Sequence, residues 1–404
     1  MGCSTSKIPT EEPSTQTSAV ETINQGRGTQ QEGQHHSSVE QPTPTPALTG
    51  EQQRHPEADG SVQRQVDGNA EKAKYRLTRQ IERGSHSRIF EAFDRVTNKR
   101  VAIKFLARGV YCKNLRAEIT NHMMLVHPHI IEAKEVYLTP QFLALVLEYA
   151  PGGDLFKYVD ARGHLDDGTA RRIFQQLVIA LEYCHEKKVI NRDLKPENTL
   201  IMTLDGRPYV KLCDFGYSKQ VIETKCKTQV GTVGYTAPEI LRGGSDYNSA
   251  CDVWSLGCLL YVMVVGDYPF LCESERLDDK ALFRRTQDRV LKADYIFPGD
   301  VEVSRGAADL IRQMLVVDIE KRISISGIKR HPWFRQDLPK AALTLNQDCL
   351  RVPAFQIQSR ADLERILAEA EHAGVARTNS AGSSNSVFAP RRLSSIPSGS
   401  SGRS

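Results

Sequence analysis

The stretch that decides the fold of this chain is NRDLKPEN, residues 191–198. It places an acid, Asp193, five positions before an amide, Asn198, with Lys195 between them. Phosphoryl transfer needs the nucleotide phosphates neutralised and aligned and the incoming hydroxyl oriented, and a few charged residues suffice for this. In such a site Asp193 would accept the hydroxyl proton, Lys195 would lie beside the transferring phosphate, and Asn198 would offer an amide oxygen to Mg²⁺. The stretch therefore predicts a phosphoryl-transfer site.

Three further motifs supply the groups that this chemistry still needs. Asp214, in the tripeptide DFG, would provide the hard carboxylate that Mg²⁺ prefers. Lys104 closes the run VAIK and could reach phosphate oxygens if Glu118, in the following helical segment, held it in place. Each motif alone is weak, because a DFG tripeptide or a lysine at a strand end is usually a turn or a solvated charge. Together with APE at 237–239 they occur in the order of the protein kinase signature, and coincidence is then negligible.

Composition and charge narrow the class of protein further. The chain has 404 residues, 40% hydrophobic and 25% charged, which is ordinary usage for a soluble globular protein. Its 53 basic residues nearly match its 49 acidic ones, so the net charge of +4 gives no case for a nucleic-acid partner. Nine cysteines without a C-x-x-C pair favour free thiols in a reducing, cytoplasmic compartment.

The pattern along the chain predicts an α+β fold of two lobes. Short strand-like runs begin at Tyr75 and a polar turn separates two of them, which favours a small antiparallel sheet with one helix at 113–125. The predicted strands are 75–81, 89–94, 100–106, 130–138 and 141–149. Beyond residue 150 the pattern becomes helical, with segments at 167–187, 250–265, 279–291 and 305–315. The apolar run 253–266 is shorter than the roughly 20 residues that cross a bilayer and is expected to be a buried core helix.

These patterns divide the chain into four parts. Residues 1–72 are polar and poor in aromatics, so they are expected to form a disordered tail. Residues 73–335 form the two lobes, 73–150 and 151–335, and residues 336–375 form an extension with one amphipathic helix. Residues 376–404 are rich in Ser, Gly and Arg and are expected to be a second flexible tail.

The helix of the extension is expected to dock on another element. Its apolar positions Leu363, Ile366, Leu367 and Ala370 share one face. Ser359 and Asp362 have the spacing of an N-terminal cap, and Gly374 is the expected stop.

Residues 75–335 resemble a eukaryotic protein kinase domain, and the resemblance implies that ATP binds with Mg²⁺ between the lobes. Leu147 then matches the gatekeeper, and Asp252 matches the anchor of the catalytic stretch. Arg322 matches the partner of Glu239. The resemblance assigns nucleotide contacts to Ile81, Glu82, Gly84, Ile89, Ala102, Lys104, Glu148, Ala150, Asp154, Asn198 and Asp214.

Two of the motifs depart from the family. The glycine-rich loop keeps only Gly84 of three glycines, with Glu82 and Ser87 in the other places. Glycines let the backbone approach phosphates, and a carboxylate there adds repulsion of about 1 kcal/mol at ~4 Å in water. Asn191 replaces the usual histidine before Arg192. An active kinase is the main prediction, a feebly active pseudokinase scaffold is the alternative, and a pure interaction module built on the tails is a third class.

The resemblance also implies serine/threonine specificity, through Lys195 and Thr232. Asp154 and Glu197 stand where many such kinases hold an arginine three residues before the target, so an Arg-x-x-Ser/Thr preference is expected. Surface charge is the alternative interpretation of these two acids.

Closer likeness lies in CDFGYSK at 213–219, LVLEYAPGGDLF at 145–156 and IKRHPWFRQDLP at 328–339. These stretches resemble plant and green-algal relatives of the sucrose-nonfermenting kinase, second subfamily, associated with osmotic and nutrient stress. In that subfamily a short helix after the kinase domain packs on the helix that carries the conserved glutamate. The resemblance implies that Leu363, Ile366 and Leu367 hold the Glu118 helix, and an ordinary capping helix is the alternative.

Two further segments predict how the protein is activated and how it is held at a membrane. Arg192 is expected to pair with a phosphate on Thr228, added by an activating kinase or by autophosphorylation. The start MGCSTSK matches the myristoylation pattern at Gly2, and Cys3 beside it could take palmitate. Two acyl chains anchor a protein stably at a membrane, whereas one does so only marginally. A chance match at the start of the chain is the alternative.

Overall fold

A computed structural model describes residues 74–84, 87–108, 113–215, 233–243, 248–271, 278–355 and 357–374. All of them belong to the second of two compact units of the chain, Pro56–Ser404. The predictions for Gly2, Cys3, Thr228 and Thr232, and for the tails 1–72 and 376–404, lie outside the described residues.

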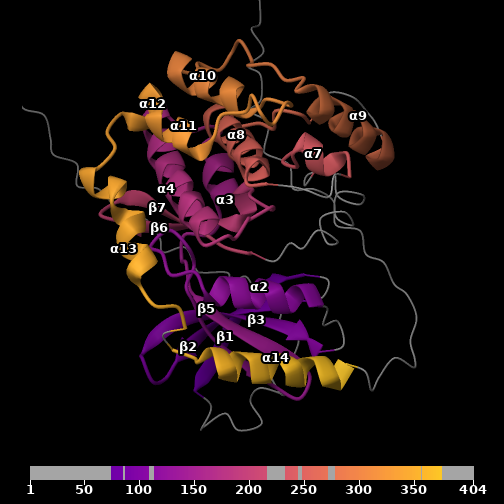
Figure 1. The fold of residues 1–404 in the computed structure, drawn as a ribbon, viewed down its shortest axis with the longest axis vertical. Coiled ribbons are helices and arrows are strands. Elements are labelled where there is room, and N and C mark those ends of the chain that lie inside the picture. The colour runs from indigo at the N-terminus through magenta and orange to yellow at the C-terminus, as the bar shows by residue number, and fades with distance from the viewer. Residues whose placement is uncertain are drawn as a thin grey trace, which may run out of the picture. The chain divides into compact units, whose positions relative to one another are not determined.

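The small lobe is a five-stranded antiparallel sheet in the order β1-β2-β3-β5-β4 (Figure 1). The strands are β1 Tyr75–Arg83, β2 Ser87–Asp94, β3 Lys99–Ala107, β4 Ala133–Leu138 and β5 Phe142–Glu148. Apolar side chains of one face form a first core, in which Phe90 and Phe105 meet edge to face at 5.8 Å. The α+β prediction for this lobe is confirmed.

One helix, α2 (Lys113–Met123), packs on the other side of the sheet. Its buried residues Ile119 and Met123 contact Val136 of β4 and Leu143 and Leu145 of β5 in a second core. This packing fixes the side of the sheet on which Glu118 lies.

The large lobe is mainly helical, as the sequence predicts. Its central helix α8 (Ala250–Val265) is buried along nearly its whole length and packs with α4 (Asp167–Glu186). The N-cap residue of α4, Asp166, accepts a hydrogen bond from the backbone N–H of Thr169. The expected buried core helix is thus confirmed, and none of the helices in the described ranges is long and apolar enough to cross a membrane. The remaining helices are α3 Leu155–Asp160, α4 Asp167–Glu186, α7 Pro238–Leu241, α9 Asp279–Lys292, α10 Arg305–Met314, α11 Ile325–Arg330 and α12 Pro332–Arg335.

A two-stranded hairpin follows the stretch NRDLKPEN. The stretch ends in the short 3₁₀ helix η3 (Pro196–Asn198), and the hairpin strands are β6 Thr199–Leu204 and β7 Arg207–Leu212. The hairpin therefore fixes the position of Asn198 at one end and leads into Asp214 at the other.

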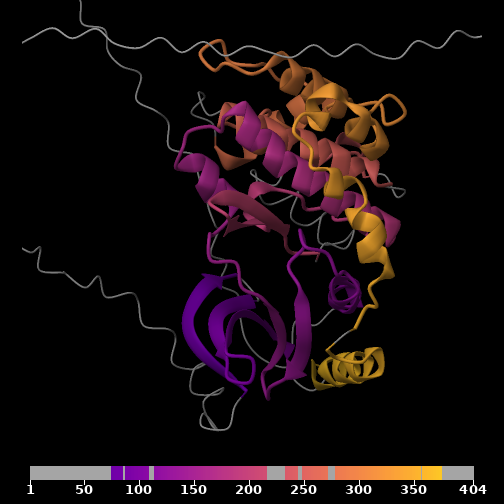
Figure 2. The same cartoon turned by 90° about the vertical axis from the view of Figure 1, so that its left-hand side faces the viewer.

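The extension contributes η4 (Lys340–Leu343), α13 (Leu345–Arg351) and α14 (Arg360–Gly374). Leu363, Leu367 and Ala370 are fully buried against α2, β4 and β5, and Figure 2 shows α14 beside the small lobe with α2 seen end-on. The predicted cap is confirmed, because Ser359 Oγ accepts from the N–H of Asp362 at 3.1 Å.

One strand boundary predicted from the sequence is wrong. The apolar run 130–138 predicts a strand from its first residue, but β4 begins at Ala133. Ile131 instead donates its N–H to the carbonyl of Leu212 in β7, at 2.8 Å. The apolar pattern is real, but these residues bind the hairpin rather than the sheet.

Candidate active site

Lys104 of β3 lies between two carboxylates that come from distant parts of the chain. Its Nζ is 3.4 Å from Asp214 Oδ1 and 3.6 Å from Glu118 Oε1 of α2. Burial opposes the charge of Lys104, but the carboxylates of Asp214 and Glu118 outweigh it and raise the pKa of the lysine above its usual value. Lys104 is therefore a fixed positive charge between Glu118 and Asp214.

The side chain of Asp193 is held by two polar residues of its own stretch, Lys195 and Asn198. Asn198 Nδ2 donates to Asp193 Oδ2 at 2.6 Å and to the Asp193 carbonyl at 2.8 Å, and Lys195 Nζ lies 3.0 Å from Asp193 Oδ2. Burial opposes the charge of Lys195, but Asp193, Glu197 and Asp214 outweigh it and raise its pKa. Because the Asp214 carboxylate acts on both Lys195 and Lys104, the two groups of residues share one electrostatic site.

The donor set of this site fits Mg²⁺. Asp214 offers a carboxylate, and Asn198 presents its amide oxygen because its nitrogen is engaged with Asp193. Mg²⁺ takes oxygen ligands and usually keeps several waters, bound through one or two protein groups plus substrate phosphates. In the described part of the chain no group of three or more His, Cys, Asp or Glu side chains could hold a metal ion.

Asp252 of α8 binds the backbone of the stretch NRDLKPEN at its first two residues. Its fully buried carboxylate accepts from the backbone N–H groups of Asn191 at 3.0 Å and Arg192 at 2.8 Å, and from His185 Nε2 at 2.8 Å. Arg192 has a φ of 66°, a left-handed conformation that costs a non-glycine residue about 1 kcal/mol or more. The hydrogen bonds to Asp252 compensate for this strain and set the direction of Asp193.

Asn191 contributes to the same turn with its side chain. Its Oδ1 accepts from the N–H of Asp193 at 3.2 Å, while its buried Nδ2 has no hydrogen-bond partner among the described residues. The amide in place of histidine thus binds the backbone of Asp193.

Phe215, next to Asp214, is buried against a histidine of α2. The ring centroids of Phe215 and His122 are 5.1 Å apart, and His122 Nε2 donates to the carbonyl of Ile131 at 2.7 Å. Burial lowers the pKa of His122 to about 4, so its ring is neutral near pH 7 and packs as an apolar group. This contact links the position of Asp214 to that of α2.

The turn after β1 holds the residues that depart from the glycine-rich pattern. Gly84 donates its N–H to the carbonyl of Ser87 at 2.8 Å, and Glu82 is exposed opposite Ile89 of β2. Burial raises the pKa of Cys213, and the carboxylates of Asp214 and Glu82 add to this effect. The charge of Glu82 therefore acts on the residue that precedes Asp214, although the Glu82 side chain is exposed.

The predicted hinge residues are also engaged in the scaffold. Glu148 Oε2 is 2.8 Å from Lys211 Nζ and accepts from the N–H of Glu132, and the N–H of Glu148 donates to the Glu132 carbonyl. Asp154 caps α3 by accepting from the N–H of Lys157 at 2.8 Å. The remaining predicted nucleotide contacts lie on the sheet or next to it. Ile81 is on β1 and Ile89 is on β2. Ala102 is on β3 opposite Leu147, and Ala150 lies just after β5.

The predicted pair of Glu239 and Arg322 is present and buried. The guanidinium binds the carboxylate through two hydrogen bonds of 2.8 and 2.9 Å and also donates to the carbonyls of Val316 and Ala250. This pair joins the APE segment to the large lobe.

Sequence reasoning missed three residues of the site, namely His122, His185 and Lys211. His122 could have been found, because it follows Glu118 by four positions and so shares its helix face. His185 and Lys211 carry no such signal, because their partners Asp252 and Glu148 are far away in the sequence.

A bilobal fold with these groups at the junction of the lobes defines the class of protein kinases. The family model described as protein kinase domain matches residues 75–334, and the chain belongs to this family. Among its relatives are plant proteins named serine/threonine-protein kinase. SRK2H of Arabidopsis thaliana is 42% identical over 298 residues, covering 72% of this chain and 79% of the relative. SAPK3 of Oryza sativa subsp. japonica is 46% identical over 251 residues, covering 61% of this chain and 73% of the relative.

Proposed function

We propose that this chain transfers the γ-phosphate of ATP, bound with Mg²⁺, to serine or threonine hydroxyls of proteins. One observation carries the proposal. Lys104, Glu118 and Asp214 meet within 3.6 Å beside an Asp193 that is bracketed by Lys195 and Asn198. The printed names of the relatives support the choice of serine and threonine.

Each residue has a distinct task in this reaction. Asp193 orients the incoming hydroxyl and takes its proton, and Lys195 stabilises charge on the transferring phosphoryl group. Lys104, kept in place by Glu118, binds the nucleotide phosphates. Asp214 and Asn198 would hold Mg²⁺, which neutralises phosphate charge when bound.

The first experiment is phosphate transfer from labelled ATP with Mg²⁺ to a peptide containing Arg-x-x-Ser. Wild-type protein should label the peptide, and Asp193→Ala should lower kcat at least about a hundredfold because the hydroxyl loses its proton acceptor. Nucleotide binding should persist in the variant, since Lys104, Glu118 and Asp214 remain in place. A wild-type protein that binds ATP but never labels any peptide would overturn the proposal in favour of a scaffold, for which the supporting observation is that the charge of Glu82 acts on Cys213, next to Asp214.

We further propose a substrate with arginine before the target residue. Oε2 of Glu197 is buried and has no hydrogen-bond partner among the described residues. Burial raises the pKa of Glu197, its own backbone N–H and Lys195 lower it, and the carboxylates of Asp193 and Asp154 raise it further. A guanidinium placed between Glu197 and Asp154 would offset the repulsion between these carboxylates and would bind the oxygen that has no partner.

We also propose that phosphate on Thr228 activates the protein and that acylation of Gly2 and Cys3 anchors it at a membrane. The proposed cellular role is in stress or nutrient signalling. The buried Nε of Arg192 has no hydrogen-bond partner among the described residues, which supports a phosphate as its partner. Thr228→Ala should lower turnover if this holds.

Gly2→Ala should move the protein from the membrane fraction to the soluble fraction of cells, and an unchanged distribution would refute the anchor.

A further inference from the structure

We infer that Asn346 of α13 is a positioning residue for the active site. Its side chain binds His127 in the turn between α2 and β4, and so ties the C-terminal extension to the pivot of the helix that carries Glu118. The inference rests on the proposed kinase activity and concerns a contact separate from the docking of α14.

The turn between α2 and β4 is attached to the large lobe. The N–H of Ile131 donates to the Leu212 carbonyl at 2.8 Å, and the N–H of Leu212 donates to the His129 carbonyl at 2.9 Å. The N–H of Val126 donates to the hydroxyl of Tyr183 in α4 at 3.0 Å. Because α2 packs on the small-lobe sheet while this turn is bound to the large lobe, any swing of α2 pivots here.

The hydrogen-bond directions at His127 are fixed by its neighbours. His127 Nδ1 accepts from the N–H of His129 at 3.0 Å, and burial, together with His129, lowers the pKa of His127 to about 3. The ring is therefore neutral near pH 7 and carries its hydrogen on Nε2. Nε2 donates to Asn346 Oδ1 at 3.1 Å.

The amide of Asn346 is hydrogen-bonded at its oxygen and at its nitrogen to two parts of the chain. While its Oδ1 accepts from His127, its Nδ2 donates to the carbonyl of Ile179 at 3.0 Å and to Glu182 Oε2 at 2.8 Å, both in α4. Glu182 is also bound to Lys329 of α11 at 2.7 Å. Since His127 and Asn346 are both buried, loss of either side chain leaves a buried donor or acceptor unpaired.

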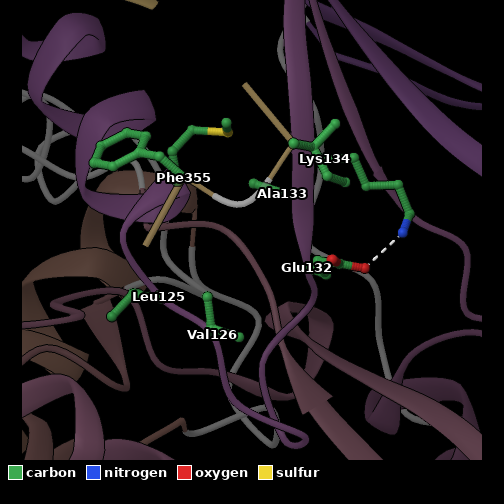
Figure 3. A pocket seen from close by; sticks show the side chains of 8 residues that line it. Leu125, Val126, Glu132, Ala133, Lys134 and Phe355 are labelled. Carbon is green, nitrogen blue, oxygen red and sulfur yellow. Dashed lines mark hydrogen bonds and ion pairs between the residues drawn. The ribbon is translucent and has the colours of Figure 1, made fainter. Parts of the chain in front are cut away.

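Beyond α13 the extension continues past the same turn. Phe355 lines a pocket together with Leu125, Val126 and Ala133, and Figure 3 shows these side chains around it. Gln358 then pairs with both the N–H and the carbonyl of Val136 in β4. The extension thus contacts the pivot first and the outer face of the small lobe second.

The test uses a substitution that separates the two ring nitrogens of His127. His127→Asn keeps an acceptor near Nδ1 for the N–H of His129 but cannot reach α13. We expect His127→Asn and Asn346→Ala each to lower kcat about fivefold to tenfold with little change in KM for the peptide. The double variant should be no worse than Asn346→Ala alone, because Asn346→Ala already removes the contact with His127 together with the two hydrogen bonds to α4. Gln347→Ala, on the exposed side of α13, is the matched control and should keep wild-type kcat.

A second readout does not depend on turnover. In nucleotide-bound protein, Asn346→Ala should accelerate amide hydrogen exchange in α2, whereas a merely structural role would accelerate it in α13 alone. Wild-type kcat in both single variants, multiplicative losses in the double variant, or unchanged exchange in α2 would each overturn the inference. Absence of peptide labelling by the wild type would instead count against the proposed function and leave the exchange result decisive for Asn346.

Discussion

Glu197 is the residue whose surroundings say most about the substrate. Its carboxylate lies in the field of Asp193 and Asp154 without a hydrogen bond to Oε2 from any described residue. A substrate arginine bound there would make a charge-assisted hydrogen bond, which contributes about 1.5–3 kcal/mol. This is enough to select one peptide over another by about one to two orders of magnitude.

We expect Glu197→Gln to lower the ratio of kcat/KM between an Arg-x-x-Ser peptide and its Ala-x-x-Ser counterpart by about tenfold or more. The ratio is measured because Glu197 lies close to Asp193, so absolute rates change for other reasons. Glu302→Gln, an exposed neutralisation in the large lobe, is the control. An unchanged ratio in Glu197→Gln would mean that Glu197 does not bind a substrate arginine.

Asn191 binds the backbone of its own stretch with an amide oxygen, at a position where the family has a histidine ring. The family places histidine there, and the sequence predicts that an amide could do part of its work. In the structure Asn191 Oδ1 holds the N–H of Asp193, and Asp252 holds the two preceding N–H groups. The geometry of the catalytic stretch therefore depends mostly on backbone hydrogen bonds, which the substitution leaves in place.

At the scale of elements, α14 is the part of the extension that stabilises α2 from outside. Leu363, Leu367 and Ala370 are fully buried in one cluster with Ile119 and Met123 of α2. Two ion pairs add to this contact, because Arg116 of α2 binds Glu364 and Glu371. These contacts support the expectation that α14 keeps Glu118 within reach of Lys104.

Leu367→Asp should undock α14, because a carboxylate cannot be buried in this apolar cluster without a partner. We expect kcat to fall about tenfold or more, with the peptide KM little changed, in the same labelling assay. Ala361→Asp places the same carboxylate on an exposed position of α14 and should keep wild-type turnover. If Leu367→Asp turns over normally, α14 only caps the lobe.

At the scale of the whole molecule, three buried histidines make stability depend on pH. Burial lowers the pKa of His122 to about 4, of His127 to about 3 and of His129 to about 4. In the unfolded chain a histidine has a pKa of about 6.5, so below this pH the unfolded state binds more protons than the folded state. Their neutral forms therefore contribute stability that is complete above pH ~6.5 and is lost as the pH falls toward about 4.

We expect the free energy of unfolding, measured by urea denaturation, to fall between pH 7 and pH 5. The limiting slope is about 1.4 kcal/mol per pH unit for each histidine, or about 4 kcal/mol for all three. His129→Leu should reduce this slope by about a third whatever it does to the absolute stability. A free energy that stays flat over this range would contradict the burial of these rings in neutral form.

The sequence by itself determined the local part of this protein. Asp193, Lys195 and Asn198 are close together along the chain, so their spacing alone predicts their grouping, and the two-lobed α+β fold and the capped helix at 360–374 follow from apolar periodicity. The apolar run at 130–138 predicted a strand but not its first residue. Periodicity indicates which residues are buried and not which element they pack against.

Only the tertiary structure decided which distant residues meet. Lys104 and Asp214 are 110 positions apart, and His127 and Asn346 are 219 positions apart. No local pattern encodes such contacts, because they arise from the packing of whole helices and strands against one another. For the same reason the unpaired oxygen of Glu197 and the neutral rings of three histidines became visible only when the surrounding side chains were in place.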